Sequence, residues 1–165
     1  MDEKRTVIAL AGNPNVGKST IFNGLTGLRQ KTGNWAGVTV AAAAGVFSAD
    51  GHSYLLVDLP GIYSLDSRSG EEEVARDFLC SGLAQTAVVV CDATCLERGL
   101  YLLKQIVSLD YVKDSGMPVI LCVNLWDEAR RKGIEIDFSL LQDVLQIPVV
   151  PICARSRKDL NTLKQ

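Results

Sequence analysis

The amino-acid sequence predicts an α/β domain with a mostly parallel, six-stranded sheet, one antiparallel edge strand, and helices on both faces. Five short runs are apolar throughout, which is typical of strands buried on both faces of a parallel sheet. They cover residues 7–11, 54–57, 87–91, 119–123 and 148–152. A sixth run alternates from Val38 to Val46, and Asp50-Gly51 then supplies the residues of a tight hairpin turn. This run predicts the antiparallel edge strand.

The composition limits the class of protein. The 165 residues are 47% hydrophobic and carry a net charge of −2. This length suits one domain, and the apolar fraction excludes a disordered chain. The nearly balanced charge argues against a general nucleic-acid-binding surface, and no apolar run reaches the roughly 18 residues of a membrane helix. Five cysteines form no C-x-x-C pair, so we expect free thiols in a soluble, intracellular domain.

Helical periodicity separates the predicted strands. Leucines and a valine recur at helical spacing between residues 96 and 107, which predicts an amphipathic helix there. Ser69–Glu72 has the spacing of a capping box, and the acidic residues 71–73 suit the positive end of a helix. Another helix begins near Asp159 and stops within a short distance. We therefore expect the sequence to be part of a longer protein.

The strongest motif lies between the first predicted strand and the helix that follows it. Residues 12–19 read Gly-Asn-Pro-Asn-Val-Gly-Lys-Ser and match G-x-x-x-x-G-K-S/T. In such a loop, successive N–H groups and the positive end of the helix dipole point at phosphate oxygens. Lys18 supplies a charge for the β- and γ-phosphates, and the Ser19 hydroxyl is a ligand for Mg²⁺. The predicted phosphate contacts are Asn13, Asn15, Val16, Gly17, Lys18, Ser19 and Thr20.

Asn124-Leu-Trp-Asp127 follows a buried strand and fits the N-x-x-D pattern. An Asp carboxylate accepts two hydrogen bonds from the N1 and N2 hydrogens of guanine, which adenine cannot supply. Asn124 is expected to tie this segment to the phosphate loop. G proteins usually have Lys at the position of Leu125, which covers the ring without adding charge. Three residues after the last strand are expected to offer a backbone N–H to guanine O6: Cys153, Ala154 and Arg155.

Asp58-Leu-Pro-Gly61 ends the strand predicted to lie beside the phosphate-loop strand. Asp58 is then placed to hold a Mg²⁺-bound water, and Gly61 to offer its N–H to a γ-phosphate. Thr39 is the candidate for a second Mg²⁺ hydroxyl ligand, although Val-Thr-Val is also ordinary strand sequence. Gly37 and Val38 complete the expected nucleotide contacts. Together these residues predict a G domain of the phosphate-loop NTPase class that binds GTP and GDP.

Longer stretches resemble the N-terminal GTPase domain of the ferrous iron transport protein B family. The most specific are Gly33-Asn-Trp-Ala-Gly-Val-Thr-Val40 and Asp58-Leu-Pro-Gly-Ile-Tyr-Ser-Leu65, and the resemblance runs from about residue 5 to the end. In that family a helical domain and a polytopic membrane domain follow. The resemblance implies a GTP-hydrolysing switch that regulates ferrous iron uptake at the cytoplasmic face of the bacterial inner membrane.

The resemblance also implies a potassium ion beside the phosphates. Its ligands would be the Asn15 side chain and the backbone carbonyls of Gly33 and Trp35. Ile62 stands where a Ras-like protein has a water-orienting Gln, and it cannot hydrogen-bond to water. We therefore expect backbone groups to position the water, with turnover on the order of 10⁻³ s⁻¹. The implied catalytic set is Asn15, Lys18, Thr39 and Gly61.

One stretch and one single residue depart from the family pattern. Ala41–Ala44 replaces residues that are usually charged, and Cys153 stands where Ser or Thr is usual. The iron itself is not expected to bind this chain, because no His, Cys and carboxylate cluster has ligand spacing.

Two alternative functions are also compatible with a phosphate loop. A soluble, potassium-dependent G protein of the tRNA-modification or ribosome-assembly type would need a basic face or an RNA-binding domain. A phosphate-loop nucleotide kinase would need an arginine-rich lid and would leave Asn124 and Asp127 unexplained. We expect guanine nucleotide and the following domains as partners, no nucleic acid, and leave a homo-oligomer open.

Overall fold

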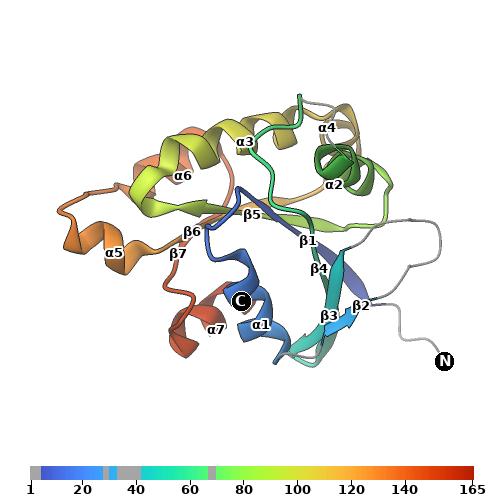
Figure 1. Cartoon of the computed structure of the whole chain (residues 1–165), viewed down its shortest axis with the longest axis horizontal. Coiled ribbons are helices and arrows are strands. Elements are labelled where there is room, and N and C mark those ends of the chain that lie inside the picture. Colours follow the sequence, from blue (N-terminus) through green and yellow to red (C-terminus); the bar gives the residue numbers. More distant parts are fainter. Residues whose placement is uncertain (1–4, 28–29, 33–41, 67–69) are drawn as a thin grey trace.

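The computed structural model describes residues 5–27, 30–32, 42–66 and 70–165. The strands of these residues form one seven-stranded sheet in the order β2-β3-β4-β1-β5-β6-β7 (Figure 1). The strands are β1 (Thr6–Gly12), β2 (Gln30–Thr32), β3 (Ala43–Ala49), β4 (His52–Asp58), β5 (Thr86–Asp92), β6 (Val119–Asn124) and β7 (Val149–Pro151).

The six expected strands are present and the fold class is confirmed, but the edge of the sheet differs from the prediction. Strands β1, β4, β5, β6 and β7 pair in parallel, and β3 is antiparallel to both of its neighbours. The short strand β2 adds a seventh strand, so β3 is second from the edge. Strand β2 was not predicted, because Gln-Lys-Thr is too short and polar to show a strand period. Residues 38–41 of the predicted alternating run lie outside the described residues.

The turn between β3 and β4 has the predicted form. Asp50 and Gly51 both have positive φ, 49° and 78°, and Ala49 pairs directly with His52. A two-residue hairpin turn with two positive φ angles matches the right-handed twist of its strands, and Asp-Gly suits it. The hairpin therefore brings β3 back along β4, whose last residue, Asp58, belongs to the predicted site.

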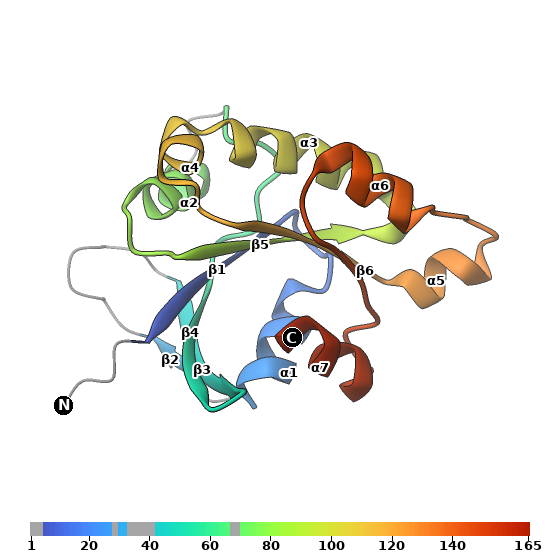
Figure 2. The same cartoon turned by 180° about the vertical axis from the view of Figure 1, so that it is seen from behind.

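Helices cover both faces of the sheet, as Figures 1 and 2 show from opposite sides. The helices are α1 (Lys18–Thr26), α2 (Gly70–Cys80), η1 (Ala93–Cys95), α3 (Leu96–Ser108), α4 (Asp110–Ser115), α5 (Trp126–Arg131), α6 (Phe138–Leu145) and α7 (Arg157–Lys164). Helices α2, α3, α4 and α6 lie on one face, and α1 and α7 lie on the other. The predicted helix at 96–107 is α3, whereas the proposed cap Ser69 lies outside the described residues.

Alternate residues of the central strands enter two hydrophobic cores. In β1, Ala9 and Ala11 face the core under α2 and α3, and Leu10 faces the core under α1. Asn13 and Asn124, by contrast, are polar yet 4% and 1% exposed. Both lie where a parallel strand ends, which is where α/β sheets bind ligands. Packing in the two cores therefore fixes the positions of the strand ends at which Asn13 and Asn124 lie.

The cysteines are free thiols, and two of them are buried in the sheet. Burial raises the pKa of Cys91 to about 12 and raises the pKa of Cys122 as well. These thiols are therefore neutral core side chains. Among the described residues, no helix combines the length and the apolar character needed to cross a bilayer.

Candidate nucleotide-binding site

The phosphate-loop motif forms a tight loop between β1 and α1. Asn15 and Gly17 have positive φ angles of 63° and 85°. A Cβ on Gly17 would lie 2.2 Å from Nδ2 of Asn124, so both its conformation and its neighbour require glycine. Helix α1 begins at the next residue, Lys18. The loop therefore presents the positive end of α1 to the space beside it.

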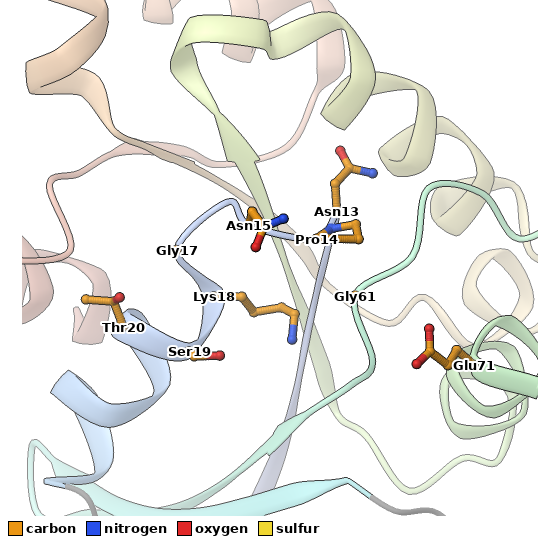
Figure 3. Close-up of a pocket in the computed structure, with 9 residues that line it drawn as sticks. All are labelled: Asn13, Pro14, Asn15, Gly17, Lys18, Ser19, Thr20, Gly61 and Glu71. Atoms are coloured by element: carbon orange, nitrogen blue, oxygen red, sulfur yellow. The ribbon is translucent and has the colours of Figure 1, made fainter.

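A cavity of about 580 Å³ opens beside this loop (Figure 3). Its lining consists of Asn13, Pro14, Asn15, Gly17, Lys18, Ser19, Thr20, Gly61 and Glu71. Figure 3 shows Lys18 reaching from the start of α1 toward the segment that carries Gly61, with Glu71 on the far side. Six predicted phosphate-contact residues thus line one cavity together with Gly61.

Lys18 is paired within the protein. Its Nζ forms an ion pair with Oδ1 of Asp58 and donates a hydrogen bond of 2.6 Å to the backbone oxygen of Leu59. The side chains of Lys18 and Asp58 are 10% and 14% exposed, so solvent screens this pair less than a surface pair. The predicted phosphate-binding cation and the predicted Mg²⁺-water ligand therefore neutralise each other in this structure.

The segment after Asp58 is hydrogen-bonded to the phosphate loop. The backbone N of Ile62 donates to the backbone oxygen of Gly12 at 3.1 Å. In return, the buried Nδ2 of Asn13 donates to the backbone oxygen of Ile62 at 2.9 Å. A Cβ on Gly61 would lie 3.1 Å from Cα of Pro14, so the two backbones are in close contact. Gly61 is thereby held against the phosphate loop.

A second cavity of about 150 Å³ adjoins the loop on its other side. Its lining consists of Asn15, Gly17, Thr20, Asn124, Leu125, Asp127, Glu128, Cys153, Ala154 and Arg155. Because Asn15, Gly17 and Thr20 line both cavities, the two cavities are two parts of one site. The six residues predicted to contact the base all line the smaller part: Asn124, Leu125, Asp127, Cys153, Ala154 and Arg155.

Asn124 joins the segments around this smaller cavity. Its Nδ2 donates to the backbone oxygen of Val16 at 2.9 Å, which is the expected tie to the phosphate loop. Its Oδ1 accepts from the backbone N of Ala154, also at 2.9 Å. One buried side chain therefore fixes the phosphate loop and the loop after β7 relative to each other.

Asp127 has a buried oxygen without a partner. Its Oδ1 is the side-chain atom that, among the described residues, is buried and makes no hydrogen bond. Its Oδ2 lies 3.5 Å from Nη2 of Arg131, and this pair is exposed, at 41% for Asp127 and 71% for Arg131. Such exposed pairs contribute little. A buried, unpaired carboxylate oxygen is costly unless a donor arrives, so Asp127 suits a ligand that brings N–H groups.

The loop after β7 differs in detail from the expectation. The backbone N of Cys153 donates to Oδ2 of Asp159 at 2.8 Å, and that of Ala154 is bonded to Asn124. Two of the three N–H groups expected to face the base thus have acceptors within the chain. Arg155 is exposed at the cavity.

Several predicted residues lie outside the described part of the chain: Gly33, Trp35, Gly37, Val38 and Thr39. Sequence reasoning missed three lining residues, Pro14, Glu71 and Glu128. Pro14 and Glu128 directly adjoin assigned residues. The sequence analysis relates Glu71 only to the helix dipole, although Glu71 lies in the first turn of α2, and its place shortly after Gly61 could have indicated that it lies near the site. Ser19, Asn15 and Asp58 offer the oxygen atoms that hard cations prefer.

This sheet order, with the glycine loop after β1 and the two cavities that meet at it, defines the phosphate-loop GTPase fold, the G domain. Comparison with known proteins identifies the family. The family model described as ferrous iron transport protein B matches residues 6–165, and the chain belongs to this family.

The chain is similar to the Fe(2+) transporters FeoB of Escherichia coli K12 and Shigella flexneri. It is 42% identical to each, and the match covers 98% of this chain and 21% of theirs. The chain thus spans about a fifth of these relatives.

Solved structures agree with this assignment. The cytosolic domain of the T. maritima FeoB iron transporter has a TM-score of 0.86 in its GDP form, at 42% identity, and the match covers 97% of this chain and 60% of that chain. Its GMPPNP form has a TM-score of 0.86 at 43% identity, and the match covers 96% of this chain and 61% of that chain. The FeoB G-domain from Methanococcus jannaschii has a TM-score of 0.81 at 40% identity, and the match covers 98% of this chain and 94% of that chain.

Proposed function

We propose that the chain binds GTP and GDP with Mg²⁺, hydrolyses GTP slowly to GDP and phosphate, and thereby regulates ferrous iron uptake by a longer membrane protein. The observation that carries the nucleotide assignment is the buried, unpaired Oδ1 of Asp127 at the smaller cavity. The GDP and GMPPNP forms of the T. maritima relative support it.

On the purine side, Asp127 accepts the N1 and N2 hydrogens of guanine, and Leu125 covers the ring. Leu125 has a positive φ of 60°, an uncommon backbone conformation for this residue type that caps α5 and sets the direction of the segment. Guanine O6 accepts from the backbone N–H of Arg155, because those of Cys153 and Ala154 have acceptors in the chain. Adenine would leave the Asp127 oxygen unpaired, so this side sets specificity.

On the phosphate side, nucleotide binding exchanges partners. Lys18 leaves Asp58 and Leu59 for the β- and γ-phosphates. Asp58 is then free to hold a Mg²⁺-bound water, while Ser19 and Thr39 provide hydroxyl ligands. A Mg²⁺ ion held by these residues would neutralise part of the phosphate charge. The partly buried Lys18–Asp58 pair supports this exchange, because both groups already share the cavity.

Backbone groups position the attacking water, because Ile62 stands where a Ras-like protein has a water-orienting glutamine. Gly61 donates its N–H to the γ-phosphate, and Ile62, 3% exposed, is in the core and cannot orient the water. Asn15, with the carbonyls of Gly33 and Trp35, would hold a potassium ion, whose charge would offset that of the phosphates where other G proteins receive an arginine finger. Turnover is therefore slow without a partner.

Loss of the γ-phosphate releases Thr39 and Gly61, so that residues 30–40 and 61–70 relax. The full protein carries this domain on the cytoplasmic face of the bacterial inner membrane, followed by helical and membrane domains. The small share of the FeoB relatives that the chain spans supports a longer protein. The change in these segments would be passed to those domains.

Titration of the chain with fluorescent GDP, GTP and ATP tests the proposal. We expect guanine nucleotides to bind at least about 100-fold more tightly than ATP. Equal binding of the purine nucleotides, or no binding, would overturn it.

Hydrolysis rates in KCl and NaCl test the potassium site: equal rates would remove the role assigned to Asn15.

A further inference from the structure

One side chain of α3 is bonded to three consecutive residues of the segment after Gly61. Oε1 of Gln105 accepts from the backbone N of Leu65 at 2.7 Å. Its Nε2 donates to Oγ of Ser64 at 3.2 Å and to Oδ2 of Asp66. Both N–H groups of the amide and its oxygen are thus used on this segment.

The same segment is fastened to the phosphate loop at its other end. Asn13 donates to the backbone oxygen of Ile62, and the side chains of Ile62 and Leu65 are both 3% exposed in the core. Residues 62–66 therefore lie between two anchors, the phosphate loop and α3. Gly61 immediately precedes the first anchor.

The Gln105 anchor is polar and partly open to solvent. Tyr101, one turn earlier on α3, donates from Oη to Oδ2 of Asp66 at 3.3 Å, but its side chain is 53% exposed. Tyr63, within the segment, is 58% exposed. Gln105 therefore supplies most of the bonded contacts that hold the 64–66 end against α3.

We propose that Gln105 is a positioning residue for GTP hydrolysis. By holding residues 64–66 on α3, it fixes the path of the backbone that leads back to Gly61, and so the place of the Gly61 N–H relative to the phosphate loop. The inference rests on the proposed function, in which Gly61 contacts the γ-phosphate. GDP lacks the γ-phosphate that Gly61 would contact, so we expect Gln105 to affect the GTP-bound state and not the GDP-bound state.

The test replaces Gln105 in the whole chain and measures binding and turnover separately. Gln105→Leu is expected to lower kcat about tenfold, because small misplacements of a donor cost much of its effect. The Kd for GDP stays within about twofold of wild type, and the preference for a GTP analogue over GDP falls. Lys104→Leu, exposed on the same helix, is the matched control and leaves all three values unchanged.

If Gln105→Leu fails to fold, a pair of variants that exchanges the amide of Gln105 and the carboxylate of Asp66 still tests the proposal. Gln105→Glu retains the acceptor for Leu65 but turns a carboxylate toward Asp66, so kcat falls. Adding Asp66→Asn supplies the missing donor from the opposite side, and kcat recovers. Asp66→Asn alone keeps an oxygen for the Gln105 amide and has a small effect.

The outcomes separate the two proposals. If wild type neither binds GDP nor hydrolyses GTP, the proposed function fails. If wild type is active and Gln105→Leu or Gln105→Glu leaves kcat unchanged, the positioning role is overturned. A parallel loss of kcat and GDP affinity, or a double variant that does not recover, also overturns it, because either would show general damage.

Discussion

The phosphate side and the purine side of the site meet at Gly17, but they differ in whether their charged groups already have partners within the protein. On the phosphate side, Lys18 is paired with Asp58 and Leu59 inside the protein. On the purine side, Oδ1 of Asp127 is buried and has no partner. A ligand must therefore replace existing bonds on one side, whereas on the other it supplies a missing one.

This difference separates affinity from specificity. When phosphate contacts replace the charged contacts within the protein, the net gain in binding free energy is only part of the energy of the new contacts. Every nucleoside triphosphate gains this free energy equally, because the phosphates are the same. An unpaired buried acceptor costs about 1–3 kcal/mol, and only a base with donors in the right place removes that cost. In the function that we propose, the phosphate side would therefore hold any nucleotide, and Asp127 would select guanine.

The largest expected effect comes from Asp127→Asn. The amide offers a donor where the carboxylate offered an acceptor, so xanthine replaces guanine as the preferred base. We expect the ratio of GDP to xanthosine diphosphate affinity to change by about a thousandfold, or ~4 kcal/mol. Competition against a fluorescent nucleotide measures it. Glu128→Gln, beside it on the same cavity, is the control; an unchanged guanine preference in Asp127→Asn would contradict the assignment.

Lys18→Ala tests the phosphate side and should have the next largest effect. It removes charge-assisted bonds worth about 1.5–3 kcal/mol each and leaves the Asp58 carboxylate facing the phosphates. Affinity for GTP and GDP should fall about 100-fold, while the ratio of GTP to ATP affinity stays the same. Calorimetric titration measures both. Lys113→Ala, exposed on α4, is the control, and a collapse of purine discrimination would refute the separation.

Asn124→Ala should damage both sides together, because it leaves the Val16 oxygen and the Ala154 N–H without partners. We expect a loss of about 3 kcal/mol in the free energy of unfolding, measured by urea denaturation without nucleotide. Asn161→Ala, exposed on α7, controls for loss of an amide. Stability equal to wild type would show that the two loops do not depend on this bridge.

The smallest effect is expected for Cys153→Ser. The contact of Cys153 with Asp159 uses the backbone N–H, so exchanging sulfur for oxygen should leave GDP affinity within about twofold. The fluorescent-GDP titration used for the wild type is sufficient. A much larger loss would mean that the thiol itself contacts the nucleotide, and that the departure from the family pattern matters.

Much of this site could be predicted because its residues carry local signals. The glycine loop and N-x-x-D each lie directly after a buried strand, and a strand end is visible in the sequence as the point where the apolar run stops. The hairpin at Asp50-Gly51 was predictable for the same reason, since the positive φ angles there restrict the residue types. Strand β2 lacked any such signal.

Apart from the tie between Asn124 and the phosphate loop, which was expected and is present, pairings between distant segments were not predictable. Nothing in the order of residues shows that Lys18 is bonded to Asp58, that Asp159 accepts from Cys153, or that Gln105 holds residues 64–66. Glu71 was assigned to a helix terminus, yet it faces the phosphate cavity. These contacts depend on how α2, α3 and α7 pack on the sheet.

The sequence by itself determined the α/β class, the phosphate loop and the place of the N-x-x-D segment at a strand end, because backbone conformation and burial act over a few neighbouring residues. The tertiary structure decided which of those groups are already paired and which oxygen is left without a partner. That depends on side chains meeting across the sheet, and such meetings are set by packing rather than by sequence spacing.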